Sequence, residues 1–227
     1  MKYSILSILL FISVFVQAQS TDNFDAYADQ SSLNAAANWA SELNDMKIQK
    51  PAADGEFSPN ATGGEISVYY VGTFNADQYS QFVFTAIQAG ITIGVSVRNS
   101  ATGASDYYGW YSGTGQSYLF KVDNGVYTQF DVGTAWTAND VIKLEINGNE
   151  LSCYRNSALD LSIMGTGKYT DNSFSTGNPG VCGYGNSSGT KGDSWEGDDI
   201  AVDAYDPPQF MPSYGLSDKR PTLKAIA

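Results

Sequence analysis

Residues 91–154 form a run of short segments rich in Val, Ile, Tyr and Phe, and each segment ends in turn residues. Two of the breaks are the Asn-Gly pairs Asn124-Gly125 and Asn147-Gly148. Asn-Gly is the strongest short-range hairpin signal, because both central residues of a type I′ turn need a positive φ. The stretch therefore predicts consecutive antiparallel β-hairpins, to which the rest of the chain adds further strands.

Period-two alternation continues outside this stretch. In residues 65–74 the apolar Ile66 and Val68 alternate with Glu65 and Ser67, which is the pattern of a strand with one buried face. The whole chain predicts about eleven or twelve strands and almost no helix. We therefore expect an all-β fold, either a two-sheet antiparallel sandwich or a barrel.

Residues 45–64 are the main interruption in this pattern. They contain Pro51, Pro59 and the pair Gly63-Gly64, and proline cannot donate to a strand ladder. We therefore predict mainly loop here, with room for one edge strand. Trp39, which precedes this segment, is predicted to fill the core.

The N-terminus has the three parts of a secretory signal peptide. Lys2 supplies a positive charge, residues 5–16 form an apolar run, and Val16-Gln17-Ala18 is a small-residue cleavage site. The run is too short for a transmembrane helix. We expect residues 1–18 to be removed and the product to be secreted, periplasmic or displayed at the cell surface, with no membrane insertion after cleavage.

The remaining chain is predicted to form a single domain. No linker rich in Pro, Gly and Ser divides residues 19–206, and a domain of that size is ordinary for an all-β fold. Residues 207–227 begin with Pro207-Pro208 and show no periodicity. They predict an extended C-terminal tail that is free or packed on a neighbouring molecule.

Charge and composition exclude several classes of function. The chain has 24 acidic and 12 basic residues, a formal net charge of -12 and no histidine. Nucleic acids and anionic membranes need a basic surface, so neither partner is expected. The lack of histidine excludes Ser-His-Asp and Cys-His catalysis. A charged fraction of 16%, with 23 Gly and 15 Tyr, favours a turn-rich extracellular β-domain.

Cys153 and Cys182 are the two cysteines, and both lie in strand-like segments. An exported protein meets an oxidising environment, so a Cys153–Cys182 disulfide is one prediction. The alternative is a pair of separate buried thiols that pack as small apolar side chains. A metal site on this pair is not expected without histidine or a CxxC spacing.

A series of short motifs resembles a known superfamily. The motifs are TDNFD, FNADQYSQ, GVSVRN, DYYGWY, YLFKVDNG, IKLEINGNELSCYRN, GNPGVCGYG and WEGDDIAVDAYD. In this order they cover nearly all of residues 21–205 and resemble the concanavalin A-like lectin/glucanase jelly roll, which includes LamG-like domains. The resemblance implies two curved antiparallel sheets, adjacent first and last strands, and a concave face that often binds glycans.

The same resemblance allows glycan cleavage to be considered. Laminarinase-type glucanases of this superfamily carry E-x-D-x-x-E on a central strand, where alternation places the nucleophile and the general acid on one face. Here the only E-x-D is Glu196-Gly197-Asp198, and Ala201 occupies the position of the second glutamate. Catalysis is therefore not predicted, and an unrecognised pair of acids is the remaining enzymatic alternative.

A cluster of aromatic residues indicates where a ligand would bind. In an extended segment, Tyr108 and Trp110 share one face, and Tyr107 and Tyr111 share the other. Flat aromatic rings with polar groups suit the apolar faces of sugars. Core packing of one of these faces is the competing interpretation. The predicted glycan site consists of Tyr107, Tyr108, Trp110 and Tyr111, with Arg98 and Asp106 forming hydrogen bonds at its rim.

Acidic residues near both ends of the domain suggest a calcium ion. Asp22 near the first strand and Asp199 near the last carry hard oxygen ligands suited to Ca²⁺. The related glucanases often hold a structural calcium where the first and last strands meet, so the resemblance implies a site that includes Asp22 and Asp199. Solvated charges on edge strands are the alternative.

Together these features predict a secreted, non-catalytic, carbohydrate-binding β-sandwich whose partner is a polysaccharide or another glycan. A structural or adhesion protein is the alternative. In that case the sandwich and residues 207–227 would mediate self-assembly in a surface layer, a filament or a virion.

Overall fold

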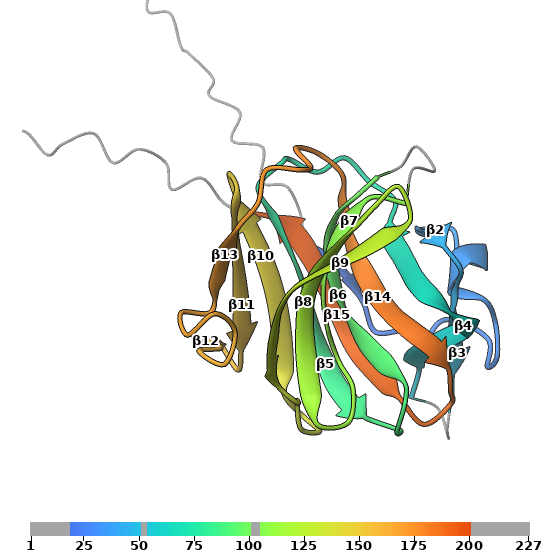
Figure 1. Ribbon diagram of the computed structural model, residues 1–227. Coiled ribbons are helices and arrows are strands. Elements are labelled where there is room, and N and C mark those ends of the chain that lie inside the picture. Colours follow the sequence, from blue (N-terminus) through green and yellow to red (C-terminus); the bar gives the residue numbers. More distant parts are fainter. Residues whose placement is uncertain (1–18, 51–53, 101–104, 201–227) are drawn as a thin grey trace, which may run out of the picture.

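The computed structural model describes residues 19–50, 54–100 and 105–200 (Figure 1). The predicted signal peptide and the predicted tail, residues 207–227, lie outside the described residues. Within the described part, no helix is long and apolar enough to cross a membrane. The helical element described is a single 3₁₀ turn, η1 (Leu33–Ala35).

Fifteen strands form two antiparallel sheets that pack face to face, which confirms the predicted all-β sandwich (Figure 1). The main strands of sheet A are, in spatial order, β12 (Ala158–Leu159), β11 (Glu150–Arg155), β10 (Val141–Asn147), β5 (Gln78–Ala86) and β15 (Lys191–Asp199). Three short strands are added to them: β1 (Ser20–Asp22) pairs with β15, β13 (Lys168–Thr170) pairs with β11, and β3 (Met46–Gln49) pairs with the start of β4 (Glu56–Tyr70). Sheet B contains, in order, β2 (Trp39–Leu43), the end of β4, β14 (Asn178–Asn186), β6 (Thr92–Asn99), β7 (Tyr107–Ser112), β8 (Gln116–Asp123) and β9 (Val126–Thr134).

The strand count exceeds the predicted eleven or twelve, because four of the fifteen strands are only two to four residues long. These are β1, β3, β12 and β13. Segments of this length contain too few residues for alternation to become visible in the sequence.

Strand β4 belongs to both sheets. Its first residues pair with β3 and, at Phe57, with Gly192 of β15 in sheet A, whereas its last residues pair with β2 and β14 in sheet B. The sequence predicts loop with one edge strand over residues 45–64, and β3 fits that allowance, whereas the loop prediction is wrong over the start of β4. Pro59 is accommodated in β4, where its carbonyl accepts a hydrogen bond from the Ser187 N–H at 3.2 Å. Burial of Phe57 outweighs the turn signals of the sequence.

The core between the sheets is built on aromatic side chains. Trp110 of sheet B meets Trp136 edge-on at a centroid distance of 4.9 Å, and Trp136 also contacts Phe82 of sheet A at 6.1 Å. Trp39 is buried, as predicted, and packs on Trp195 at 4.7 Å. Burial of one such ring contributes roughly 4–6 kcal/mol, at ~25 cal/mol per Å² of apolar surface. These rings therefore hold the two sheets together.

The two Asn-Gly pairs form different turns. Asn124 and Gly125 have φ values of 49° and 77°, so the type I′ hairpin predicted between β8 and β9 is confirmed. At the second pair, Asn147 still belongs to β10 and lies opposite Glu150, so Gly148, with a φ of 56°, is the first central residue. This turn follows the type II′ pattern, with glycine first, and lies one residue later than predicted.

The predicted Cys153–Cys182 disulfide is wrong, because both thiols are free and fully buried. Cys153 lies on β11 opposite Leu144 and packs in the core between the sheets. Cys182 lies on β14 opposite Gly94 and packs in a second apolar cluster, on the other side of sheet B. Sheet B therefore separates the two thiols, and a bond would require whole strands to move. Burial raises the pKa of both thiols, which suppresses the reactive thiolate.

Because both thiols are closed to solvent, we expect neither Cys153 nor Cys182 to react with iodoacetamide in the folded protein. In guanidinium chloride without reductant, both should be alkylated, and intact-mass spectrometry would show two additions. A protein that stays unmodified in denaturant until a reductant is added would contradict the free thiols.

Candidate functional site

Sheet B has an outer face, the side turned away from sheet A, on which polar and aromatic side chains lie in two rows. In the first row, Glu65 of β4, Tyr184 of β14 and Thr92 of β6 are direct cross-strand partners. In the second row, Tyr111 of β7 and Tyr118 of β8 are partners. Because partners on neighbouring strands share a face, residues far apart in the sequence project to the same side.

These five side chains line a pocket of about 320 Å³, here called the tyrosine pocket. Its volume lies at the lower end of the range for small-molecule sites, ~300–1,000 Å³. Tyr184 is 39% exposed and forms the outer ring of the pocket, whereas Tyr111 is 7% exposed and forms the inner wall. The remaining lining residues are Gly90, Ile91, Gly113 and Thr114.

Gly94 keeps the middle of the second row free of a side chain. It lies between its partners Cys182 and Tyr111. A Cβ atom at Gly94 would lie 2.1 Å from the Trp110 carbonyl oxygen and 2.6 Å from Tyr111 Cβ. Only glycine therefore fits at this position, because the β7 backbone approaches it too closely for a side chain.

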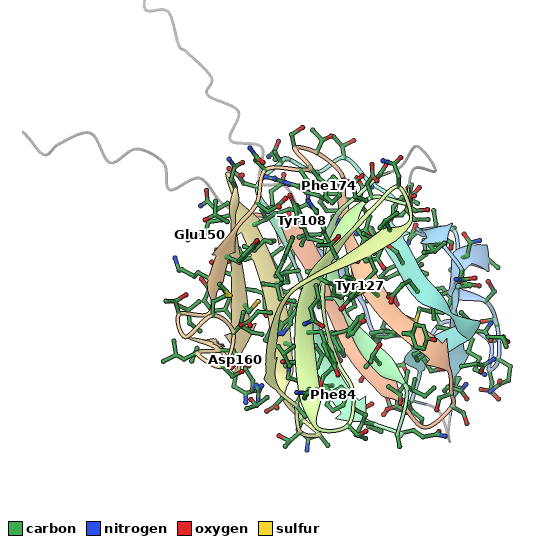
Figure 2. All side chains as sticks on the ribbon, viewed as in Figure 1. Phe84, Tyr108, Tyr127, Glu150, Asp160 and Phe174 are labelled. Atoms are coloured by element: carbon green, nitrogen blue, oxygen red, sulfur yellow. The ribbon has the colours of Figure 1, made fainter. Side chains whose placement is uncertain are left out.

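The edge strand β9 closes one side of the outer face. It crosses in front of sheet B in Figure 1, and Tyr127 lies over these strands in Figure 2. The Tyr127 ring stacks on Phe120 at 4.9 Å and on Tyr111 at 6.4 Å. The outer cluster formed here supports the inner wall of the pocket, and its buried members are Tyr107, Tyr111, Phe120, Val122 and Cys182.

Four polar atoms on the outer face are closed to solvent and have no hydrogen-bond partner among the described residues: Glu65 Oε2, Thr92 Oγ1, Ser96 Oγ and Tyr107 Oη. Buried polar atoms are normally paired, so each unpaired one calls for an explanation such as strain, a water or a ligand. Glu65 and Thr92 line the tyrosine pocket itself. The pocket lining therefore contains two residues whose hydrogen-bonding capacity is not used within the described chain.

Glu65 is the only charged residue among the described residues that line the pocket. Burial raises its pKa to about 7. The lining contains no basic residue that would compensate the carboxylate for the loss of water. Burial is the largest cause of the raised pKa values of Tyr107 and Tyr111, and the charge of Glu65 adds to both. At neutral pH the Glu65 carboxyl is thus divided between its neutral and its charged form.

The structure separates the four predicted aromatic residues onto two faces. The predicted alternation is correct, since Tyr108 and Trp110 belong to the core and Tyr107 and Tyr111 to the outer cluster. Tyr108 and Trp110 are fully buried, so their predicted stacking on a sugar is corrected to core packing. The Tyr108 hydroxyl donates to Asp171 at 2.7 Å and ties the neighbouring loop to the core. Of the four, Tyr111 lines the tyrosine pocket.

The predicted role of Arg98 as a ligand contact at the rim is also corrected, because its side chain hydrogen-bonds backbone carbonyls of three loops. Its side chain is 2% exposed and donates to the carbonyls of Ala76, Gly148 and Phe174 at 2.6–3.0 Å. Arg98 and Asp106 line a separate pocket of about 400 Å³, at the other end of β6 from the tyrosine pocket. The guanidinium therefore holds three loops together, and this use of its donors explains its burial.

Three solved structures illustrate the proteins to which this chain is structurally similar. The carbohydrate-binding module CBM66 from Bacillus subtilis superposes with a TM-score of 0.50 at 14% identity, over 73% of this chain and 95% of the module. A Bacillus subtilis protein of unknown function with a galectin-like fold gives 0.51 at 11% identity, over 81% of this chain and 96% of its own. The Crh5 transglycosylase in complex with NAG gives 0.51 at 12% identity, over 82% of this chain and 85% of its own. This protein has the concanavalin A-like lectin/glucanase fold.

The concanavalin A-like fold is the one that the sequence motifs predicted. No protein-family profile matches the sequence, and no curated protein matches it. At sequence identities of 11–14%, the structural similarity establishes the fold of this protein but not its ligand or its activity.

Within the concanavalin A-like fold, the E-x-D segment lies away from the pocket. Glu196 and Asp198 are on β15 of sheet A, and the Tyr79 hydroxyl donates to Glu196 Oε1 at 2.6 Å. Glu65 is the one carboxylate among the residues that line the tyrosine pocket. Glycoside hydrolysis by two carboxylates needs a pair roughly 5–10 Å apart, and this lining does not supply one.

The calcium site remains a prediction. Asp22 lies opposite Trp195, and Asp199 follows four residues later on β15, roughly 13 Å along the strand. Asp22 Oδ2 accepts hydrogen bonds from the Tyr27 hydroxyl at 2.5 Å and from Trp39 Nε1 at 2.8 Å. In the described part of the chain, no three acidic or cysteine side chains are grouped so as to hold a metal ion. Asp22 thus has a structural role in linking the first strand to the core.

Sequence reasoning missed Glu65, Tyr118 and Tyr184 as site residues. Glu65 carried a usable signal, since it lies on the polar side of an alternating strand. Tyr184 carried none, because it becomes a neighbour of Glu65 only through the pairing of β14 with β4. That pairing joins strands that are distant in the sequence, and local patterns do not reveal it.

Because the folded-state pKa of Glu65 is raised, its protonation stabilises the fold. This contribution is fully present below the unfolded value of 4.5 and is lost as the pH rises through about 7. The substitution Glu65→Gln should therefore raise the free energy of unfolding at pH 8 by on the order of 2 kcal/mol, and change it little at pH 4. Urea unfolding of both proteins at several pH values measures this difference. A difference that does not vary with pH would contradict the assignment.

Arg98→Met should lower the free energy of unfolding by about 3 kcal/mol, because three partly buried hydrogen bonds to carbonyls lose their charged donor. Chemical unfolding measures the change. Lys47→Met is the matched control, because the Lys47 ammonium contacts only the Asn186 side chain, at 3.3 Å, in an exposed position. Equal stability of the two variants would show that the hydrogen bonds of Arg98 do not stabilise the fold.

Proposed function

We propose that this protein is a secreted, non-catalytic, carbohydrate-binding β-sandwich that takes a glycan into the tyrosine pocket of sheet B. The observation that carries the proposal is the combination of exposed and half-buried tyrosine rings with unpaired polar atoms of Glu65 and Thr92 in one pocket. Sugars present both apolar C–H faces and hydroxyl groups, so they match both kinds of lining.

The position of Tyr184 suits it to act as the stacking platform. It is the most exposed aromatic residue of the pocket, and its partners Glu65 and Thr92 lie on either side of it. A sugar ring that lies on Tyr184 would bring its hydroxyl groups within reach of both partners. Tyrosine is well suited to this task, because it offers an apolar ring and a polar hydroxyl together.

Binding fits the pocket better than cleavage does. The lining offers the carboxylate of Glu65 alone, whereas hydrolysis of a glycosidic bond by the usual route needs an acid and a second carboxylate. The shared fold supports a carbohydrate ligand, because the structural neighbours include a carbohydrate-binding module and a transglycosylase in complex with NAG. The proposed location outside the cytoplasm rests on the signal-like residues 1–18.

The proposal predicts that the full-length chain binds at least one glycan on an array, and that Tyr184→Ala weakens this binding by about tenfold or more, as loss of a stacking ring should. Tyr154→Ala is the matched control, because Tyr154 is a partly exposed tyrosine on β11 of sheet A, far from the pocket in the topology. Repeating the measurement with EDTA tests whether the predicted calcium contributes.

Two results would contradict the proposal. One is an absence of binding to every glycan, with and without Ca²⁺. The other is equal loss of binding in the Tyr184 and Tyr154 variants. In the first case, sedimentation of the full chain and of a chain without residues 207–227 would test the structural alternative, which requires assembly that depends on concentration.

A further inference from the structure

Unlike two other acids of low exposure, Glu65 has no basic side chain beside it among the described residues of its pocket. Asp160 pairs with Arg155 at 2.6 Å, and Glu56 pairs with Lys191 at 2.8 Å. Glu65 is the one charged group in the lining of the tyrosine pocket, and its Oε2 is unpaired among the described residues. The pocket therefore offers a place for a positive charge that the protein itself does not fill.

Three tyrosine rings surround the same space, those of Tyr111, Tyr118 and Tyr184. The faces of aromatic rings attract cations, and cages of such rings recognise ammonium groups. A carboxylate and an ammonium attract each other about fourfold more strongly at an effective dielectric constant of ~20, typical near a protein surface, than in bulk water. The rings and the Glu65 carboxyl thus favour the same kind of ligand group.

We propose that the tyrosine pocket selects glycans that carry a free amino group, such as glucosamine oligosaccharides, over neutral and N-acetylated glycans. This inference rests on the proposed function, since it names the class of sugar that the same pocket takes. The ammonium group lies beside Glu65, while the apolar face of the sugar ring lies on Tyr184. Acidic sugars are disfavoured, because no basic side chain in the lining would match their carboxylate.

The test compares two ligands that differ in one group. Isothermal titration of the full-length chain at about pH 7, where part of the Glu65 carboxyl is charged, uses a glucosamine hexasaccharide and the same hexasaccharide after N-acetylation. We expect the free-amine form to bind at least about tenfold more tightly. In Glu65→Gln this preference should disappear, because the amide keeps the shape of the side chain and loses its charge.

A second variant separates the pocket from the overall charge of the protein. With a formal net charge of -12, the chain attracts any polycation at long range. Glu150→Gln removes one charge as well, but Glu150 is 47% exposed on β11 of sheet A, pairs with Lys168, and lies apart from Tyr127 in Figure 2. The preference for the free amine should survive in this variant.

The outcomes distinguish the two proposals. Equal binding of both hexasaccharides, or a preference that survives Glu65→Gln, overturns the amine selectivity and leaves glycan binding intact. A preference that Glu150→Gln removes as fully as Glu65→Gln does also overturns it, because net charge is then the cause. An absence of binding to both ligands, and to every glycan on the array, overturns the proposed function and this inference with it.

Discussion

The central strands of sheet B are buried on both faces, and this constraint decides which part of the outer face stays open to solvent. Every residue of β7 is buried, and so is nearly every residue of β6. One face packs Trp110 against sheet A, and the other packs Tyr107 and Tyr111 under Tyr127. On the outer face, the tyrosine pocket therefore lies at the end where side chains of β4, β14 and β8 remain within reach of solvent.

The sequence predicts the elements better than it predicts their surroundings. Alternation correctly separates Tyr108 from Tyr107, and the Asn124-Gly125 turn follows from the φ values that glycine and asparagine tolerate. Neither signal shows that both faces of β7 are covered, because the covering depends on the path of β9 and on Tyr127. The aromatic segment is thus predicted correctly as a strand, but Tyr108 and Trp110 pack in the core and only Tyr111 of the four lines the tyrosine pocket.

Arg98 and Glu65 illustrate the same limit for charged residues. The sequence shows that both are ionisable, but their roles depend on partners that only the fold brings near. Arg98 meets three carbonyls from three loops, so its burial stabilises the structure. Glu65 meets tyrosine rings and no cation, so its burial is unfavourable when it is charged.

The pairing of β4 with β14, and of β5 with β15, has a consequence for how the chain reaches its native state. Both pairings join strands near the beginning of the described chain to strands near its end, and such long-range contacts form slowly. Neither sheet can be completed before β14 and β15 have been synthesised. Until then β4 and β5 lack these partners, and Trp39 lacks its neighbour Trp195.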